Sequence, residues 1–291
     1  MNDPAQALEQ ACRQLGLSCA PAELIRAAEN TMYRLPGAVV ARVTRPGQLA
    51  AAGKEVRVSR WLHEAGVAVV EAVPELAQPV QVGSRAVTFW RELPAHHDGN
   101  IDQIADVLHT LHRLTPPREL DLPPLAPFVR LRERIAEADI LDGSERPWLL
   151  EHLGRLEQNY AVLPSGLPLC AVHGDAWGGN IVTTVDGPVL LDLERFAYGP
   201  PEWDLVSIAV DHVTFGTLPR ADWERFCVRY GYDVTGWAGY EVLRDARELR
   251  KVTFALQMAG QYPHLTEQAR YRLSCIQGRQ GPRPWHWQPV P

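Results

Sequence analysis

Three oxygen-bearing side chains lie close together in the sequence, with the residue types and spacing that phosphoryl transfer requires. Asp175 follows His173 and Gly174, and Asn180 and then Asp192 come next along the chain. Carboxylate and amide oxygens suit a hard cation such as Mg2+, which keeps further positions for waters or phosphate oxygens. With Asn180 and Asp192 as ligands, Asp175 is left to accept a hydrogen bond from a substrate hydroxyl.

Short apolar runs flank these three residues and predict the elements that position them. The runs are LCAV before Asp175, IV after Asn180 and PVLL before Asp192. Apolar runs of this length are typical of short buried strands. We therefore expect the polar residues to lie on turns between strands and to converge at one rim.

The first third of the chain predicts an antiparallel sheet with one helix. Strand-like runs occupy residues 22–28, 31–35 and 38–45, separated by plausible hairpin turns. An amphipathic helix is expected over residues 48–66, and a hairpin with a Gly-Ser turn over residues 79–93. Together these predict five strands and one helix before Pro94.

After Pro94 the periodicity becomes helical. The expected helices occupy residues 101–114, 127–138, 146–163, 201–215, 219–231 and 239–259. The final segment, GPRPWHWQPVP, leaves two alternatives open: a tail held to the surface by Trp285 and Trp287, or a frayed terminus.

Composition and charge limit the class of partner. The chain is 46% hydrophobic and 22% charged, which is typical of a globular protein. Residues 1–94 have a net charge of +1 and residues 95–291 of −7, which argues against binding a nucleic-acid backbone. The acidic part is compatible with a cationic substrate, although solubility alone accounts for it. We see no signal peptide and no run of the roughly 18 apolar residues that span a membrane. We expect a cytoplasmic protein whose five cysteines are reduced.

Taken together, the motifs resemble the aminoglycoside phosphotransferase family, the antibiotic and small-metabolite branch of the protein-kinase-like fold. They are H-G-D-x-x-x-x-N at 173–180, D-L-E at 192–194 and G-P-P-E-W-D-L at 199–205. The resemblance implies a bilobal α+β fold. Residues 1–94 would form a nucleotide-binding N-lobe with a five-stranded antiparallel sheet and one helix. Residues 95–291 would form a mainly helical C-lobe for catalysis and acceptor binding.

The resemblance also implies roles for individual residues. Asp175 matches the catalytic aspartate that orients the acceptor hydroxyl and takes its proton. Asn180 and Asp192 match the two Mg2+ ligands that bridge the nucleotide phosphates. His173 and Asp204 are expected to support the catalytic loop through hydrogen bonds. Any one of these residues alone would suit a turn, a strand end or a helix cap, but their order favours the functional interpretation.

On the nucleotide side the sequence departs from the family. Arg42 stands on the third strand where the family commonly has a lysine, and its helix partner would be Glu55. An arginine there is longer and planar, so the phosphate geometry should differ. Asn30 and Thr31 replace a glycine-rich phosphate loop and are expected to offer donors.

The segment from Trp90 to Leu93 corresponds to the link between the lobes. Trp90 would either form a wall of the purine pocket or fill the core. Glu92 and Leu93 are expected to contact adenine through their backbone groups.

Other charged groups are better explained by structure than by chemistry. His96-His97-Asp98 resembles a metal cluster, but a solvated loop is expected. Glu194 is either near the metal or solvated. On the helix over 239–259, acidic and basic residues alternate, which predicts a salt-bridged surface helix. Its charged residues are Glu241, Arg244, Asp245, Arg247, Glu248, Arg250 and Lys251.

These residues predict an enzyme that uses Mg2+ and ATP or GTP to phosphorylate a hydroxyl of a small molecule. The expected acceptor is an antibiotic, either an aminoglycoside or another hydroxyl-bearing natural product. One alternative is a metabolic kinase of an amino alcohol, sugar or nucleoside. Another is a nucleotide-binding module without useful catalysis, which the missing lysine favours. A metal-dependent hydrolase built on His173, Asp175 and Asp192 would need further ligands that no spacing supplies.

Overall fold

The computed structural model describes residues 3–290, and the chain divides into two compact units. Unit 1 comprises Met1–Pro123 and Gly178–Phe196, and unit 2 comprises Pro124–Trp177 and Ala197–Pro291. The chain therefore passes from one unit to the other inside the H-G-D-x-x-x-x-N motif. The assignment of nucleotide binding to residues 1–94 and of catalysis to the remainder stays a prediction.

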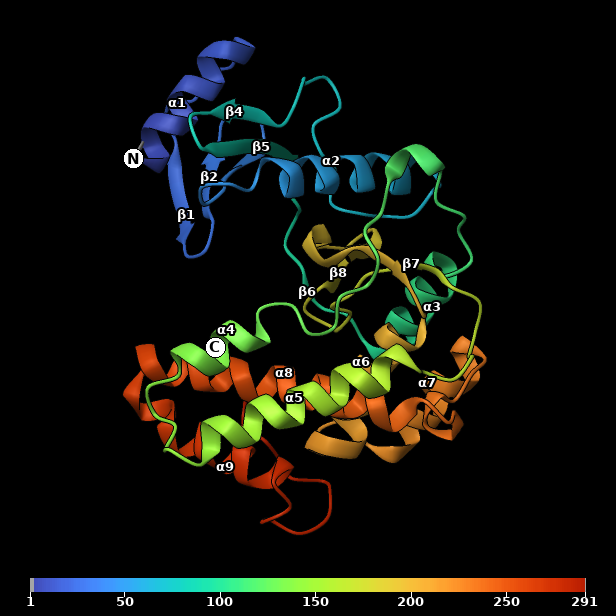
Figure 1. Cartoon of the computed structure of the whole chain (residues 1–291). Helices are drawn as coiled ribbons and strands as arrows, with labels where there is room; N and C mark the ends of the chain where they lie inside the picture. Colours follow the sequence, from blue (N-terminus) through green and yellow to red (C-terminus); the bar gives the residue numbers. More distant parts are fainter. Residues whose placement is uncertain (1–2, 291) are drawn as a thin grey trace. The chain divides into compact units, whose positions relative to one another are not determined.

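Unit 1 contains the predicted five-stranded antiparallel sheet (Figure 1). The strands are β1 (Glu23–Ala27), β2 (Thr31–Leu35), β3 (Val39–Val43), β4 (Val80–Val82) and β5 (Arg85–Arg91). They lie in the order β1-β2-β3-β5-β4, which is a meander apart from the exchange of β4 and β5. Helix α2 (Leu49–Glu64) packs on β5 and buries Val56, Val58 and Leu62. The chain leaves it at Gly66, whose positive φ of 77° suits a residue without a side chain.

A helix that the sequence reading missed, α1 (Pro4–Leu15), precedes the sheet. Its apolar residues Ala7, Leu8, Ala11 and Cys12 recur at helical spacing and pack into the core formed with the sheet. Gly16 then turns the chain back, and Cys12 and Cys19 form a disulfide. The prediction of five reduced thiols is therefore wrong for this pair, while Cys170, Cys227 and Cys275 are free.

A second, three-stranded sheet in unit 1 positions part of the candidate site. Its strands are β6 (His97–Asp98), β8 (Ile181–Thr184) and β9 (Gly187–Leu190), in the order β6-β8-β9. Helix α3 (Ile101–Leu111) follows β6 and begins with a capping box at Asn100. The solvated-loop prediction is thus wrong for the backbone of His97 and Asp98, although both side chains are exposed. Lys54 of α2 reaches the turn Leu193–Arg195, which follows β9.

Unit 2 is mainly helical, as predicted. Its helices are α4 (Leu131–Glu137), α5 (Glu145–Ala161), α6 (Glu202–Val210), α7 (Arg220–Tyr230), α8 (Tyr240–Gln261) and α9 (Thr266–Ile276). A π-helical turn (Asp211–Phe215) continues α6, and the strands β7 (Cys170–Val172) and β10 (Ala197–Gly199) pair antiparallel. Helix α9 was not predicted.

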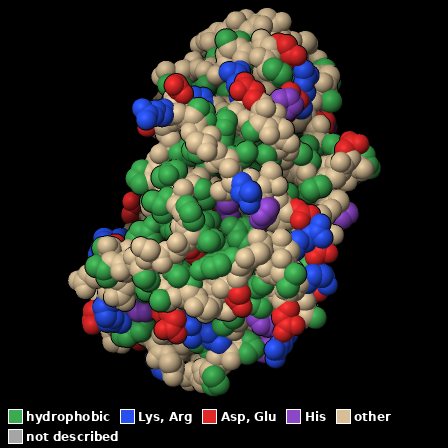
Figure 2. Space-filling model, turned by 90° about the vertical axis from the view of Figure 1, so that its right-hand side faces the viewer, with side chains coloured by type: hydrophobic (Ala, Val, Ile, Leu, Met, Phe, Trp, Pro, Cys, Tyr) green, Lys and Arg blue, Asp and Glu red, His purple; other side chains and the backbone are tan. Residues whose placement is uncertain are grey.

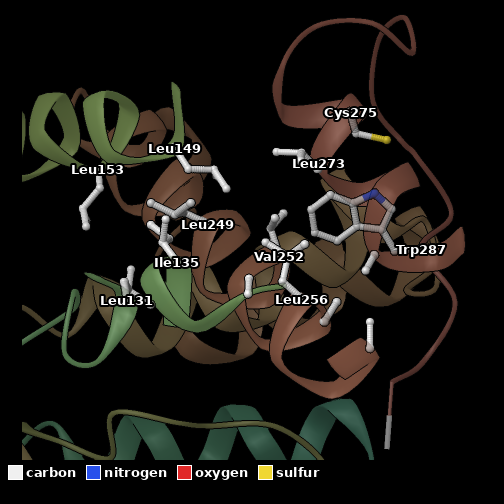
Figure 3. Close-up of a cluster of buried hydrophobic side chains, with 14 of the residues drawn as sticks. Leu131, Ile135, Leu149, Leu153, Leu249, Val252, Leu256, Leu273, Cys275 and Trp287 are labelled. Carbon is white, nitrogen blue, oxygen red and sulfur yellow. The ribbon is translucent and has the colours of Figure 1, made fainter. Parts of the chain in front are cut away.

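The core of unit 2 lies between these helices. Figure 3 shows Leu131, Ile135, Leu149 and Leu249 pointing toward one another from α4, α5 and α8. Trp285 and Trp287 of the C-terminal segment are buried in the same cluster, and the backbone N–H of Trp285 donates to the carbonyl of Thr214 (2.7 Å). Of the two alternatives for the terminal segment, the structure therefore shows the tail held by its tryptophans.

Within residues 3–290, no helix is long and apolar enough to cross a membrane. On the face drawn in Figure 2, acidic, basic and hydrophobic side chains are all exposed, and the acidic and basic ones are intermingled.

Candidate active site

The loop that carries Asp175 leaves β7 in unit 2 and is held through its backbone. Asp204, in the first turn of α6, accepts hydrogen bonds from the N–H of His173 (2.7 Å) and of Gly174 (2.8 Å). The N–H of Asp175 lies 3.2 Å from Nδ1 of the buried His173. His173 and Asp204 thus have the geometry expected of loop supports, and their contribution to catalysis stays a prediction.

A third support, Trp203, was not foreseen from the sequence. Its indole N–H donates to the carbonyl of Gly174 (2.9 Å), while its own carbonyl accepts from Nη2 of Arg247 (2.9 Å). The Arg247 guanidinium stacks on the Trp203 ring, 3.8 Å from the ring centroid. Nη1 of Arg247 lies 3.5 Å from Oδ1 of Asp175.

Helix α8 is therefore not the surface helix that its charge pattern predicted. Arg247 and Glu248 are each only 2% exposed. Glu248 accepts from Thr214 and from Arg283 of the C-terminal segment. The predicted salt bridges do form at Arg244, which pairs with Asp245 and Glu241, although the Arg244 side chain is only 13% exposed.

The electrostatics around Asp175 favour its ionised form. Partial burial acts to raise the pKa of Asp175, but Arg247, Lys251 and Arg250 together hold that pKa below its ordinary value. The side chain is still 38% exposed, so a ligand can reach it. Asp211 differs, because burial raises its pKa to about 6 despite the opposing effect of Lys251.

The two predicted metal ligands lie in unit 1, at the same end of the β8–β9 hairpin. Asn180 precedes β8 and Asp192 follows β9 closely, and the N–H of Leu191 donates to the carbonyl of Asn180 (2.8 Å). Asp192 has a positive φ of 51°, a conformation uncommon outside glycine. The antiparallel pairing thus brings together two residues that are twelve positions apart.

The donor set at this hairpin fits a hard divalent cation. One carboxylate and one amide oxygen are ligand types that Mg2+ accepts. No group of three or more His, Cys, Asp or Glu residues suited to a metal occurs within residues 3–290. A cation at this site would therefore need further oxygens from waters or phosphates, which is typical of Mg2+ bound with a nucleotide.

Arg42 on β3 forms the predicted contact with Glu55 of α2. Its Nη1 donates to Oε2 of Glu55 (2.5 Å), and its Nη2 lies 3.6 Å from Oε2 of Glu194. With the Asn30 amide turned so that its oxygen faces Arg42, that oxygen accepts from Nε (3.1 Å) and Nη2 (2.9 Å). Burial raises the pKa of Glu55, and Arg42 opposes this shift. Glu55 is buried, so it is not part of an exposed charge pair on the helix surface.

A pocket surrounds this arginine. Its lining residues are Glu29, Asn30, Arg42, Thr44, Arg45, Gln48, Ala51, Ala52, Glu55 and Glu194. Of the seven residues predicted to bind nucleotide, it contains Arg42, Glu55 and Asn30 and does not contain Thr31, Trp90, Glu92 or Leu93. Glu194 belongs to the wall of this pocket, so it is not simply a solvated carboxylate.

Several groups of the segment Trp90–Leu93 make structural contacts and are therefore not available to a ligand. Trp90 is buried against Val56 and Ala72, and its indole N–H donates to Thr88, as the core-filling alternative requires. The N–H of Glu92 donates to the carbonyl of Ala38 (2.8 Å). An adenine contact here would therefore fall to the carbonyl of Glu92 or to Leu93.

Lys54 is a further residue that the sequence reading passed over. Its Nζ donates to the carbonyls of Glu194 (2.7 Å) and Phe196 (2.9 Å) and so ties α2 to the turn that follows Asp192. Burial lowers the pKa of Lys54, with Glu55 and Glu194 opposing the shift. In the sequence, only its position next to Glu55, in a chain with two lysines, could have indicated that Lys54 contributes to the site.

The comparisons with known proteins agree with this arrangement. A model of the phosphotransferase enzyme family matches residues 22–250. A comparison with curated protein sequences gives no match.

Solved structures with this fold bind several kinds of small molecule. The amicoumacin kinase hAmiN in complex with AMP-PNP, Ca2+ and Ami has a TM-score of 0.72 at 14% identity, over 95% of this chain and 94% of that chain. The GDP and kanamycin complex of APH(2")-IIia has a TM-score of 0.66 at 14% identity, over 94% and 99%. A choline/ethanolamine kinase family protein from Mesorhizobium loti has a TM-score of 0.63 at 16% identity, over 96% of both chains. The predicted bilobal, protein-kinase-like α+β fold is thus confirmed.

Proposed function

We propose that this chain, which belongs to the phosphotransferase enzyme family, moves the γ-phosphoryl group of ATP or GTP to a hydroxyl of a small molecule. The observation that carries the proposal is the loop of Asp175, whose carboxylate is accessible and ionised while its backbone is fixed by hydrogen bonds. Phosphoryl transfer depends mainly on positioning and charge neutralisation, and a fixed carboxylate suits that task.

In this proposal the site residues divide the work of phosphoryl transfer among them. Asp175 accepts a hydrogen bond from the acceptor hydroxyl, orients its oxygen and takes its proton. Asn180 and Asp192 would hold Mg2+, which neutralises phosphate charge when it is bound. Arg42, braced by Glu55, adds a positive charge to the pocket in unit 1, where Asn30 also lies. With the Asn30 oxygen turned toward Arg42, its NH2 group would serve as the phosphate donor.

For the acceptor, we propose a hydroxyl-bearing antibiotic or natural product rather than a polycation. Lys251, Arg250 and Arg247 all act on Asp175 as positive charges. An aminoglycoside carries several ammonium groups, which these three cations disfavour close to Asp175, although Asp204 and Asp211 offset part of their charge. The same observation favours the second candidate, a metabolic kinase of a neutral acceptor such as a sugar or nucleoside, over a kinase of a cationic amino alcohol.

A screen with labelled nucleotide tests the proposal. Purified protein is incubated with Mg2+, γ-labelled ATP or GTP, and a panel of neutral, anionic and cationic hydroxyl compounds. We expect label in at least one neutral or anionic acceptor, and loss of transfer in Asp175→Asn. Nucleotide binding without transfer to any acceptor or to water would instead identify a binding module, and turnover without nucleotide would identify a hydrolase.

A further inference from the structure

We propose that Arg247 is the positioning residue of Asp175: its contact with Oδ1 sets where the carboxylate meets the acceptor hydroxyl. The inference rests on the proposed function, because that function gives Asp175 its role. It concerns a residue of α8, a helix whose charge pattern is that of an ordinary surface helix.

The contacts of Arg247 close a ring around the catalytic loop. Its Nη1 lies 3.5 Å from Oδ1 of Asp175, and its Nη2 donates to the carbonyl of Trp203. The Trp203 indole donates to the carbonyl of Gly174, the residue next to Asp175. The arginine and the loop are thus held by the same tryptophan, so the position of one determines the position of the other.

The helix that carries Arg247 is anchored firmly. Leu249 and Val252 are completely buried in the core of unit 2, where Figure 3 shows them facing residues of the neighbouring helices. The guanidinium also stacks on the Trp203 ring. A side chain fixed by stacking and by a carbonyl has little freedom to follow a moving carboxylate, so it defines where that carboxylate lies.

Stability alone gives a poor account of this arrangement. Arg247 is 2% exposed, and its buried Nε has no hydrogen-bond partner among the described residues. Burying a guanidinium with an unpaired N–H is costly, and apolar residues of similar volume usually stabilise such a position as well or better. The planar fork explains why arginine stands here, because one nitrogen takes the carbonyl while another faces the carboxylate.

Other charges also act on Asp175 and have to be separated from Arg247. They are Lys251 and Arg250 on α8 and His173 on the loop. The test therefore compares Arg247→Gln, which removes the charge, with Arg247→Lys, which keeps it. Arg244→Gln is the matched control, because it removes an arginine from the same helix that pairs with Asp245 and Glu241.

The first readout is the titration of the Asp175 carboxyl, which is monitored by carbon NMR of protein labelled at aspartate Cγ. The Asp175 signal is assigned by its absence from Asp175→Asn. We expect the wild-type carboxyl to titrate below the ordinary aspartate pKa. It should titrate at higher pH in Arg247→Gln, return toward the wild-type value in Arg247→Lys and remain unchanged in Arg244→Gln. Arg247→Gln protein that is folded but has an unshifted titration overturns the proposal. If that variant does not fold, a wild-type carboxyl that titrates above the ordinary value overturns it equally.

The second readout separates this inference from the proposed function. With the acceptor found in the screen, we expect kcat of Arg247→Gln to fall about 100-fold, as for a misplaced catalytic group, with KM for the nucleotide unchanged. A merely structural residue would lower the melting temperature and leave the titration in place. If no acceptor is found, the proposed function fails, whereas the titration still decides whether the Arg247 charge acts on the Asp175 carboxylate.

Discussion

Replacing Asp204 by alanine should release the loop that carries Asp175. Asp204 is completely buried, and its two oxygens accept from the N–H groups of His173 and Gly174 at 2.7 and 2.8 Å. Alanine would leave both donors buried without a partner. We therefore expect a loss of folding stability together with a loss of phosphoryl transfer.

The size of the effect follows from the two donors. An unsatisfied buried backbone donor costs about 1–3 kcal/mol, so the pair should cost about 2–6 kcal/mol. Removing the carboxylate also removes the cost of burying its charge, which places the expected value in the lower half of that range. Asp204→Asn keeps the shape and one acceptor oxygen, and should lose roughly half as much.

Urea unfolding, followed by tryptophan fluorescence, measures the loss. The matched control is Asp222→Ala, because Asp222 is also an acid in the first turn of a helix, α7, where it pairs with Arg225. That variant should lose less than about 1 kcal/mol. If Asp204→Ala loses no more than Asp222→Ala, Asp204 is only a helix-end acid, and the reasoning about the loop is refuted.

Three further predictions concern charges elsewhere in the molecule. The pKa of Asp211 is raised to about 6 from 3.8, so its protonated form is favoured by folding; this stabilisation is full below pH 4 and is lost as the pH rises through 6. Wild-type protein should therefore lose up to about 3 kcal/mol between pH 4 and 7 relative to Asp211→Asn, and parallel stability curves for the two proteins would contradict this. Lys54→Met should weaken the binding of Mn2+ with a nucleotide analogue, because the turn after Asp192 loses its hydrogen bonds to α2. Titration calorimetry measures this affinity, and the control Arg57→Met, at an exposed position of the same helix, should leave it unchanged. Equal affinities in the two variants would contradict a role of Lys54 in holding the turn. Arg42→Ala leaves its buried glutamate partner unpaired and should cost about 3 kcal/mol at pH 8. At pH 5 the cost should be smaller, since that glutamate has a raised pKa and can take up a proton; a cost independent of pH would show that its charge is compensated elsewhere.

Local patterns were sufficient to predict most elements of the fold. Alternating and apolar runs predicted the five strands of the first sheet, and helical spacing predicted α2 to α8. The same spacing is present in α1, where Ala7, Leu8 and Ala11 form an apolar face that the sequence reading did not consider. The polar ends of the apolar runs predicted that Asp175, Asn180 and Asp192 converge at one rim. Asn180 and Asp192 do lie at one end of the β8–β9 hairpin, because antiparallel pairing returns the chain to its starting edge, and the convergence with Asp175 stays a prediction.

The remaining features depend on tertiary contacts that no local pattern encodes. Acidic and basic residues alternate along α8 as they do on a solvated helix, yet packing against Trp203 buries Arg247 beside Asp175. The contact that holds the Asn30 oxygen against Arg42, once the amide is turned, likewise comes from the neighbouring strand, and it leaves the expected NH2 donor unaffected. Both outcomes depend on which side chains the fold places opposite each other.

The most direct test of the account is the transfer of labelled γ-phosphoryl to the acceptor from the screen, compared between wild type and Asp175→Asn. The wild type should transfer the label in the presence of Mg2+. The variant should bind nucleotide with unchanged affinity and transfer label at least about 100-fold more slowly. Equal rates in the two proteins would contradict the role of Asp175, and with it the proposed phosphotransferase mechanism.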